Sequence, residues 1–282
     1  FTGSEGTFGV ATKITVRLLP QPEAVKTFLG IFPDVDSACT AVSAVIGHGI
    51  VPAALEMIDA LSIRAVQNVM DAGYPDDAGA VLLIELEGLQ EEVDEIGAEV
   101  EAALWESGPT QVRIAEKAED RDILWVGRKG ALGALGSLAP NYYLVDGVVP
   151  RTQLTQVLRR VAEISQEHGI PIANVFHAGD GNLHPCLLFD ERKPGAMAAI
   201  VAAGAEVMKV CVDAGGTLTG EHGVGLEKKE LMPLVYSEED MAAMRLVREA
   251  FAPENRLNPG KIFPDGIHYL PPARRPEPGL SI

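Results

Sequence analysis

Residues 80–105 read AVLLIELEGLQEEVDEIGAEVEAALW, and this stretch contains the pattern that decides the fold. Its first eight residues are apolar enough for a buried strand. Residues 91–105 are acidic but repeat apolar side chains at helical spacing, at Val93, Ile96, Val100 and Leu104. The stretch therefore predicts one buried strand followed, after a short connection, by one amphipathic helix.

The same alternation extends from residue 25 to residue 168. Strands are predicted at 25–32, 53–58, 80–87, 111–115 and 142–149, and helices at 35–47, 61–70, 91–105, 120–135 and 153–168. Short connections and acidic helices fit an α+β fold built like doubled ferredoxin-like units, with a largely antiparallel sheet and helices mainly on one face. A parallel, doubly wound sheet is the alternative, because alternating order alone does not determine strand direction.

The first nine residues read Phe-Thr-Gly-Ser-Glu-Gly-Thr-Phe-Gly. Three glycines with hydroxyl side chains between them allow the backbone to approach a ligand closely, as phosphate-cradling loops do. The alternative is a glycine-rich turn that enters an edge strand, since residues 11–19 are strand-like and stop at Pro20.

The composition excludes several classes of protein. The chain has 282 residues, of which 47% are hydrophobic and 22% charged, and no apolar run is long enough for a spanning helix, so a globular protein is expected. A net charge of −17 argues against nucleic acid and anionic lipid as partners. Three scattered cysteines, Cys39, Cys186 and Cys211, favour a reducing compartment, and the predicted location is cytoplasmic.

Two strand-like runs, 172–178 and 183–189, flank the sequence Gly-Asp-Gly-Asn, and Asp-Gly is a strong hairpin signal. If Asp180 and Gly181 are the two turn residues, His177 and His184 lie directly opposite each other on one face. Their imidazoles could then converge on one metal ion. A longer loop would break this register.

A third candidate ligand follows a predicted Ala-rich helix at 196–214. Glu221 and His222 lie between glycines, where the side chains can project into a cleft. Two histidines and one carboxylate leave a coordination position open, as in catalytic divalent-metal sites, and His222 would be a base beside the metal. The alternative is a glycine-rich hairpin whose histidines and Glu221 are simply hydrogen-bonded or solvated.

Other candidate residues have weaker patterns. Arg128 lies beside Trp125 and glycines and could present its guanidinium to a small anionic substrate, or it could be a surface residue of an amphipathic helix. Tyr143 and Asp146 are equally ambiguous. Residues 258–261 read Asn-Pro-Gly-Lys, a turn that presents a lysine.

Several of these segments together resemble FAD-linked oxidases of the vanillyl-alcohol-oxidase type. The resemblance rests on five segments in the family's order: Gly3-Ser-Glu-Gly-Thr-Phe-Gly9, Arg128, His177-Ala-Gly-Asp-Gly-Asn-Leu-His184, Gly220-Glu-His-Gly-Val-Gly225 and Asn258-Pro-Gly-Lys261. It covers nearly the whole chain. Residues 125–129 and 139–150 look most like the branch that contains the FAD-linked subunit of glycolate oxidase, with D-lactate and D-2-hydroxyglutarate dehydrogenases as relatives.

The resemblance implies oxidation of a D-2-hydroxy acid by hydride transfer to FAD. It implies that His177, His184 and Glu221 hold a divalent metal, Zn, Mn or Fe, and that His222 takes the hydroxyl proton. Arg128 would bind the substrate carboxylate, with Tyr143 nearby. Tyr143 and Cys186 stand where the D-2-hydroxyglutarate relatives place a lysine and an asparagine, which favours glycolate or D-lactate over a dicarboxylate.

The resemblance also implies a domain plan and partners. Residues 1–22 would be the last loop and strand of a truncated FAD-binding domain, 23–240 a substrate or cap domain, and 241–282 a C-terminal helix and FAD-facing segment with an extended tail at 271–278. The residues expected to face FAD are Gly3, Ser4, Gly6, Thr7, Asn258 and Lys261. Without a complete FAD domain the chain is expected to be a fragment that binds FAD weakly.

Partner subunits are a further expectation from the family. Glycolate oxidase relatives assemble with another flavin-type subunit and an iron–sulfur subunit, through which membrane association could arise. Two other functions stay open: a metal-dependent hydrolase that uses the same histidines and glutamate, and a non-catalytic interaction subunit.

Overall fold

The computed structural model describes residues 1–265, and the predicted extended tail at 271–278 lies outside this range. Contacts within the chain divide it into two units: residues 18–221, and residues 1–17 together with the segment from His222 onward. The family-based boundaries after residues 22 and 240 stay a prediction. Among the described residues, none of the helices combines the length and apolar character that crossing a bilayer would need.

Residues 18–221 are built around one sheet whose strands differ in length. Every pair of neighbouring strands among the described residues is antiparallel. The order of neighbouring strands is β4-β1-β3-β2-β7-β8-β6, with β9 paired to both β5 and β7. The antiparallel prediction is confirmed, and the doubly wound alternative is wrong. The strands are β1 (Ala24–Phe32), β2 (Ala54–Asp59), β3 (Ala80–Gly88), β4 (Gln111–Ala115), β5 (Asn141–Leu144), β6 (Gly147–Val148), β7 (Ile172–His177), β8 (Asn182–Leu183) and β9 (Pro185–Phe189).

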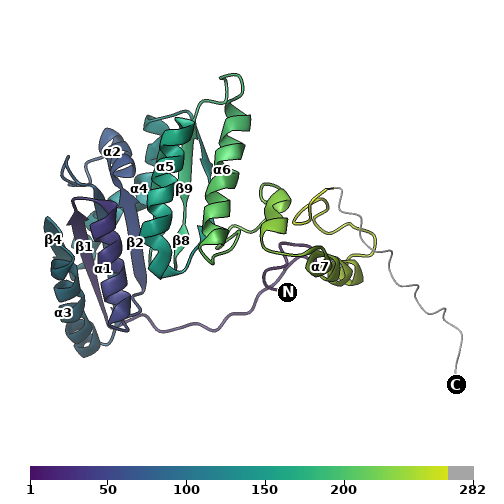
Figure 1. The fold of residues 1–282 in the computed structure, drawn as a ribbon. Helices are drawn as coiled ribbons and strands as arrows, with labels where there is room; N and C mark the ends of the chain where they lie inside the picture. Colours follow the sequence, from purple (N-terminus) through teal and green to yellow (C-terminus); the bar gives the residue numbers. More distant parts are fainter. Residues whose placement is uncertain (266–282) are drawn as a thin grey trace, which may run out of the picture. The chain divides into compact units, whose positions relative to one another are not determined.

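Helices cover both faces of this sheet, four on one and two on the other (Figure 1). One layer runs α3-α1-α5-α6, and the other consists of α2 and α4. Successive side chains of strand β1 point to opposite faces of the sheet and so contact both helix layers. Leu29 and Ile31 pack with α2 and α4, whereas Phe28 points to Gly97 of α3. The helices are α1 (Val35–Gly47), α2 (Ala60–Val69), α3 (Gln90–Glu106), α4 (Ala118–Ala134), α5 (Leu154–His168) and α6 (Ala196–Asp213).

The strand predicted at residues 11–19 is wrong. These residues form neither helix nor strand, and the side chains of Ile14, Val16 and Leu18 are exposed. Alternating apolar residues describe a strand only when a neighbouring strand pairs with them. Among residues 1–265 no strand pairs with this segment.

Two predicted continuous strands are each broken once. The run at 142–149 forms β5 and β6, with Asp146 in the gap, and the run at 183–189 forms part of β8 and β9, with His184 in the gap. Breaks in a ladder re-aim a side chain. Here both breaks aim polar groups at one place, because His184 Nε2 lies 3.7 Å from Asp146 Oδ1.

The second unit contains a short 3₁₀ helix, Lys229–Leu234, and α7 (Glu238–Phe251). Helix α7 begins with a capping box, in which Ser237 accepts from the Asp240 backbone and Asp240 accepts from the Ser237 backbone. Phe8 of the N-terminal loop stacks on Phe251 at the end of this helix, with ring centroids 4.6 Å apart. The unit is therefore formed by the two ends of the chain together.

A buried carboxylate, Asp59, joins β2, α2 and β7. Its Oδ1 accepts from the Ser62 backbone at 2.9 Å and caps α2, while its Oδ2 accepts from the backbone and side-chain amides of Asn174 at 2.8 Å each. Losing Asp59 removes a helix cap and leaves a buried backbone donor on β7 without its acceptor.

We expect Asp59→Ala to lower the free energy of unfolding by roughly 2–4 kcal/mol, from one lost cap and one buried unsatisfied donor. Asp34→Ala is the matched control, because Asp34 caps α1 through Ser37 at 2.7 Å but is exposed. It should cost only about 1 kcal/mol. Urea unfolding measures both, and equal losses would contradict the role given to Asp59.

Candidate metal centre

The predicted two-residue turn at Asp180 and Gly181 is wrong. His177 pairs with Asn182, so the loop has four residues, 178–181, and His177 and His184 are not directly opposite. The longer loop is held by tertiary hydrogen bonds, since Gly179 donates to the Leu55 carbonyl and Arg151 donates to the Gly179 carbonyl, each at 3.0 Å. Such contacts are not visible in the local pattern.

The two histidines nevertheless converge, because the register is shifted by two residues rather than one. A shift of one would move His184 to the other face, whereas a shift of two keeps it on the same face as a diagonal neighbour of His177. The ring centroids lie 5.2 Å apart with the rings edge to face. The Nε2 atoms of both rings lie 3.3 Å from Oε1 of Glu221.

Glu56 on β2 holds His177 from the other side of the ring. The two residues are directly paired across β2 and β7, and His177 Nδ1 lies 2.7 Å from Glu56 Oε1. Arg128 of α4 donates to the other oxygen, Oε2, through Nη2 at 2.8 Å and Nε at 3.1 Å. Both partners of this ion pair are largely buried, with side-chain exposures of 14% for Arg128 and 10% for Glu56.

These contacts shift two pKa values. Burial alone would raise the pKa of Glu56, but the hydrogen bond from His177 and the charge of Arg128 outweigh burial, so the pKa lies below its usual value. The hydrogen bond to Glu56 raises the pKa of His177, although burial opposes this shift. The hydrogen bond between Glu56 and His177 thus contributes to both shifts.

Asp146 organises the loop that carries Glu221. It is fully buried, and its carboxylate accepts from the Thr219 hydroxyl at 2.6 Å and from the backbone amides of Gly220 at 3.0 Å and Glu221 at 3.2 Å. A Cβ at Gly220 would lie 2.4 Å from Cγ of Asn182, so a larger residue there would displace the Asn182 side chain. The loop is thus fixed against β8 immediately before Glu221.

The arrangement brings the three predicted metal ligands together. One ligand atom each from His177, His184 and Glu221 lies within 4.8 Å of the others. His184 is 5% exposed, His177 32% and Glu221 52%, so the group opens to solvent on one side. A hollow of ≈370 Å³ adjoins it, lined by Val148, His177, Asp180, Asn182, Gly220 and Glu221.

Tyr143 and Arg128, two predicted residues of the larger unit, do not contribute a ligand atom to this group. Tyr143 of β5 packs its ring against Gly204 of α6. Arg128 reaches the group only through Glu56. His222 is exposed and is the first residue of the other unit. The roles predicted for these three residues therefore stay predictions.

The residues predicted to face FAD lie together in the unit formed by the chain ends. Asn258 donates from its side chain to the Glu5 carbonyl at 2.6 Å, so the turn at 258–261 meets the N-terminal loop. The Glu5 carboxylate accepts from the backbone amides of Val224 and Gly225 at 2.8 Å each. Gly3 and Gly6 have φ values of 83° and 74°, a region that favours glycine.

Two residues beside the candidate metal centre were not predicted from the sequence: Glu56 was not identified, and the role of Asp146 was left open. Glu56 is the one charged residue before Asp59 in the otherwise apolar strand ALEMID, and Asp146 interrupts the apolar run YYLVDGVV. A carboxylate in a buried strand needs a partner, so this placement was the available signal. Neither pattern says which partner it has.

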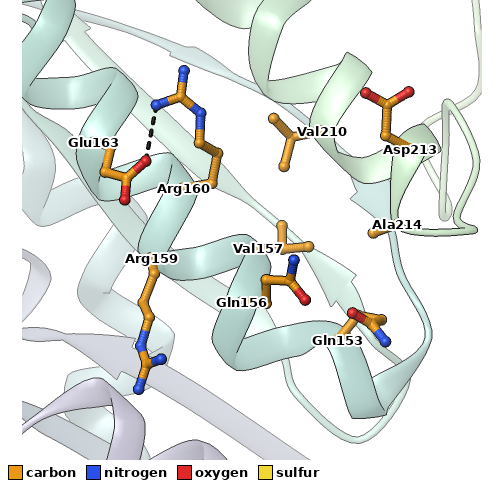
Figure 2. Close-up of a pocket in the computed structure, with 9 residues that line it drawn as sticks. All are labelled: Gln153, Gln156, Val157, Arg159, Arg160, Glu163, Val210, Asp213 and Ala214. Carbon is orange, nitrogen blue, oxygen red and sulfur yellow. Dashed lines mark hydrogen bonds and ion pairs between the residues drawn. The ribbon is translucent and has the colours of Figure 1, made fainter.

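A separate groove of ≈630 Å³ lies between α5 and α6 (Figure 2). It contains Arg159 and Arg160, but both are engaged by carboxylates. Arg159 binds Asp36 at 2.7 Å, and Arg160 binds Glu163, toward which Figure 2 shows it directed, as well as Glu206 at 2.7 Å. Because both arginines of the groove are paired with carboxylates, the groove gives no sign of a binding site for an anionic ligand.

Comparison with known proteins gives one family. A family model described as "FAD linked oxidases, C-terminal domain" matches residues 21–262. The chain is 44% identical to the glycolate oxidase subunit GlcD of Escherichia coli strain K12, over 94% of this chain and 53% of that protein. It is 30% identical to a probable mitochondrial D-lactate dehydrogenase of Danio rerio, over 93% of this chain and 53% of that protein.

The fold has relatives among solved structures. A 4-ethylphenol oxidase from Gulosibacter chungangensis matches with a TM-score of 0.65 at 15% identity, over 89% of this chain and 56% of that one. This likeness concerns the fold alone. The resemblance inferred from the sequence motifs is confirmed, and the chain spans about half the length of the curated relatives it matches.

We expect Asp146→Ala to release the loop before Glu221, because the backbone amides of Gly220 and Glu221 lose their acceptor. Hydrogen exchange of these two amides should accelerate. Asp180→Ala is the control, since Asp180 lines the same hollow without holding this loop. Unchanged exchange in Asp146→Ala would contradict the assignment.

Proposed function

This chain belongs to the FAD linked oxidases, as their C-terminal domain, and on that premise we propose that it forms the substrate-binding part of a flavin-dependent enzyme that oxidises a small D-2-hydroxy acid. The names of its relatives, a glycolate oxidase subunit and a D-lactate dehydrogenase, support this substrate class. The observation that carries the proposal is the convergence of His177, His184 and Glu221 on one open point.

These three residues would hold a divalent metal. Two imidazole nitrogens and one carboxylate oxygen suit Zn, Mn or Fe, and a three-residue set leaves a position for substrate. When bound, such an ion supplies positive charge that polarises a hydroxyl group and makes its proton easier to remove. Glu56 and Asp146 fit this use, because they fix His177 and the Glu221 loop without occupying the side that faces the hollow.

Arg128 would bind the substrate carboxylate. Its recorded hydrogen bonds to Glu56 use Nε and Nη2, and a guanidinium has five donors in all. Since Glu56 already balances the charge of Arg128, this contact would orient the substrate more than attract it. Cys186 is fully buried, so it offers no polar group for a second carboxylate, in agreement with a monocarboxylate such as glycolate or D-lactate. We assign Tyr143 a place at the edge of this site.

The remaining roles complete the proposal. His222, which directly follows Glu221, would take the hydroxyl proton. FAD supplies the hydride acceptor when bound, and Gly3, Ser4, Gly6, Thr7, Asn258 and Lys261 would lie against it. The meeting of the two chain ends at Glu5 and Asn258 supports this grouping.

One relative is a glycolate oxidase subunit, and this name supports assembly of the chain with other subunits. An iron–sulfur subunit would be one of these partners. The chain would be cytoplasmic, and it would associate with a membrane only through such partner subunits.

We expect the purified chain to retain about one equivalent of divalent metal, as a three-ligand site predicts. Elemental analysis after loading and dialysis measures it, and the His177→Ala, His184→Ala double variant should retain none. The matched control is His48→Ala with His168→Ala, which removes two exposed histidines elsewhere. A wild-type chain without metal at saturating supply would contradict the proposal.

Removing the metal should also destabilise the chain. At a metal concentration 100 times Kd, binding adds about 2.7 kcal/mol, which a chelator abolishes. A Tm that does not respond to the chelator, in a chain shown to carry metal, would contradict binding at a folded site.

Glycolate or D-lactate should bind to the metal-loaded chain and not to the metal-free chain, as measured by calorimetry. We expect Arg128→Lys to weaken this binding about 10-fold, because lysine keeps the charge beside Glu56 but loses the planar fork. Arg121→Lys is the control, since Arg121 lies on the same helix and binds Glu85 instead. Equal affinity in wild type and Arg128→Lys would exclude Arg128 as the carboxylate ligand.

A further inference from the structure

Glu56 has two oxygens with two different partners. Oε1 lies 2.7 Å from His177 Nδ1, and Oε2 receives both hydrogen bonds from Arg128. The carboxylate is 10% exposed, so water competes little for either oxygen. Each oxygen is therefore committed to one neighbour.

The chemistry of these neighbours determines where the proton of His177 lies. Two hydrogen bonds from the Arg128 guanidinium to Oε2 favour the carboxylate anion of Glu56. A carboxylate anion can only accept hydrogen bonds, so Nδ1 of His177 must carry a hydrogen. In the neutral ring the lone pair is then on Nε2. Nε2 is the atom that lies 3.3 Å from Glu221 Oε1, on the side of the candidate metal centre.

We propose that Glu56 is the positioning residue that keeps the Nε2 lone pair of His177 directed at the metal, and that Arg128 locks Glu56 in the orientation this requires. The inference rests on the proposed function, since it assigns a role toward the metal held by His177, His184 and Glu221. Hydrogen-bonded partners of ligating histidines act in this way at metal sites generally. It gives Arg128 a second task besides substrate binding.

The opposing charges around Glu56 come from elements already described. Arg128 approaches from α4 and His177 from β7, on the face of the sheet that α4 covers. The same helix makes an equivalent set of contacts one strand away, where Glu85 of β3 accepts from Trp125 at 2.8 Å and from Arg121 at 3.3 Å. Glu85 also accepts from Thr27, at 2.7 Å.

Glu85 thus provides a matched control within the chain. Glu56→Gln and Glu85→Gln remove the same charge from the same face of the sheet and disturb the same helix. Only Glu56 is bonded to His177.

The informative variant is Glu56→Gln, which has nearly the same shape. Arg128 has donors only, so it requires the amide oxygen on its side. The amide nitrogen must then face His177 Nδ1 and donate to it. This reverses the hydrogen bond, moves the ring proton to Nε2, and removes the lone pair that the metal needs.

The first measurement is the tautomer of His177 in the metal-free chain, from long-range ¹H–¹⁵N spectra of histidine-labelled protein at a pH where the ring is neutral. We expect the Nδ1–H form in wild type and in Glu85→Gln, and the Nε2–H form in Glu56→Gln. Adding Arg128→Met to Glu56→Gln frees the amide to turn, and the Nδ1–H form should return.

The second measurement is metal affinity. Glu56→Gln should bind metal about 10- to 100-fold more weakly than wild type, the usual effect of losing such a partner, and Glu85→Gln should bind as wild type does. Recovery of affinity in the double variant would confirm that hydrogen-bond direction, and not loss of packing, is the cause. A double variant that stays in the Nε2–H form would overturn the part given to Arg128.

The outcomes separate this inference from the proposed function. If Glu56→Gln keeps the Nδ1–H form and wild-type metal affinity while wild type binds metal, the role of Glu56 is overturned and the proposed function stands. If wild type binds no metal, both are overturned. An equal loss of metal affinity in Glu85→Gln would show a general structural effect and would also overturn the inference.

Discussion

The pairing of β2 with β7 is the constraint on which the larger unit depends. It joins the half of the sheet formed by β4, β1, β3 and β2 to the half formed by β7, β8 and β6. Three residue pairs form the ladder between the two strands: Glu56 with His177, Met57 with Phe176, and Ile58 with Val175. Two pairs are apolar and buried, whereas the third consists of His177, a candidate metal ligand, and its hydrogen-bond partner Glu56.

The junction is reinforced by two carboxylates of β2, Glu56 at one end of the segment paired with β7 and Asp59 just beyond its other end. Asp59 binds the Asn174 amides, and Glu56 binds the His177 ring, so each connects β2 to β7 through side chains as well as backbone. Buried carboxylates are costly unless their oxygens are satisfied. Here the oxygens are satisfied by groups from α2, α4 and β7, which makes the register of the junction specific. The candidate metal centre is consequently positioned by the same contacts that align the two halves of the sheet.

Local patterns were sufficient to predict the elements and to select the three candidate metal ligands, His177, His184 and Glu221. The predicted strand and helix positions from residue 25 to residue 135 agree with the structure to within two residues. The predicted strands are short apolar segments, and the helices between them are longer. The hairpin prediction placed both histidines on the same face although its turn was wrong. A register shift by an even number of residues leaves each side chain on the same face of the sheet. The strand prediction at residues 11–19 was wrong, because a strand also needs a pairing partner, and a local sequence pattern does not show whether one is present.

The sequence by itself therefore determined the order of elements, the antiparallel α+β class, the family, and the identity of His177, His184 and Glu221 as a candidate group. Those properties follow from periodicity and from residue types within short segments. Only the tertiary structure decided the loop length after His177, the pairing of Arg128 with Glu56, and the burial of Asp146 beneath the Glu221 loop. Each of these depends on a partner more than 20 residues away, and hydrogen-bond partners at such separations are chosen by how strands and helices pack rather than by neighbouring residues.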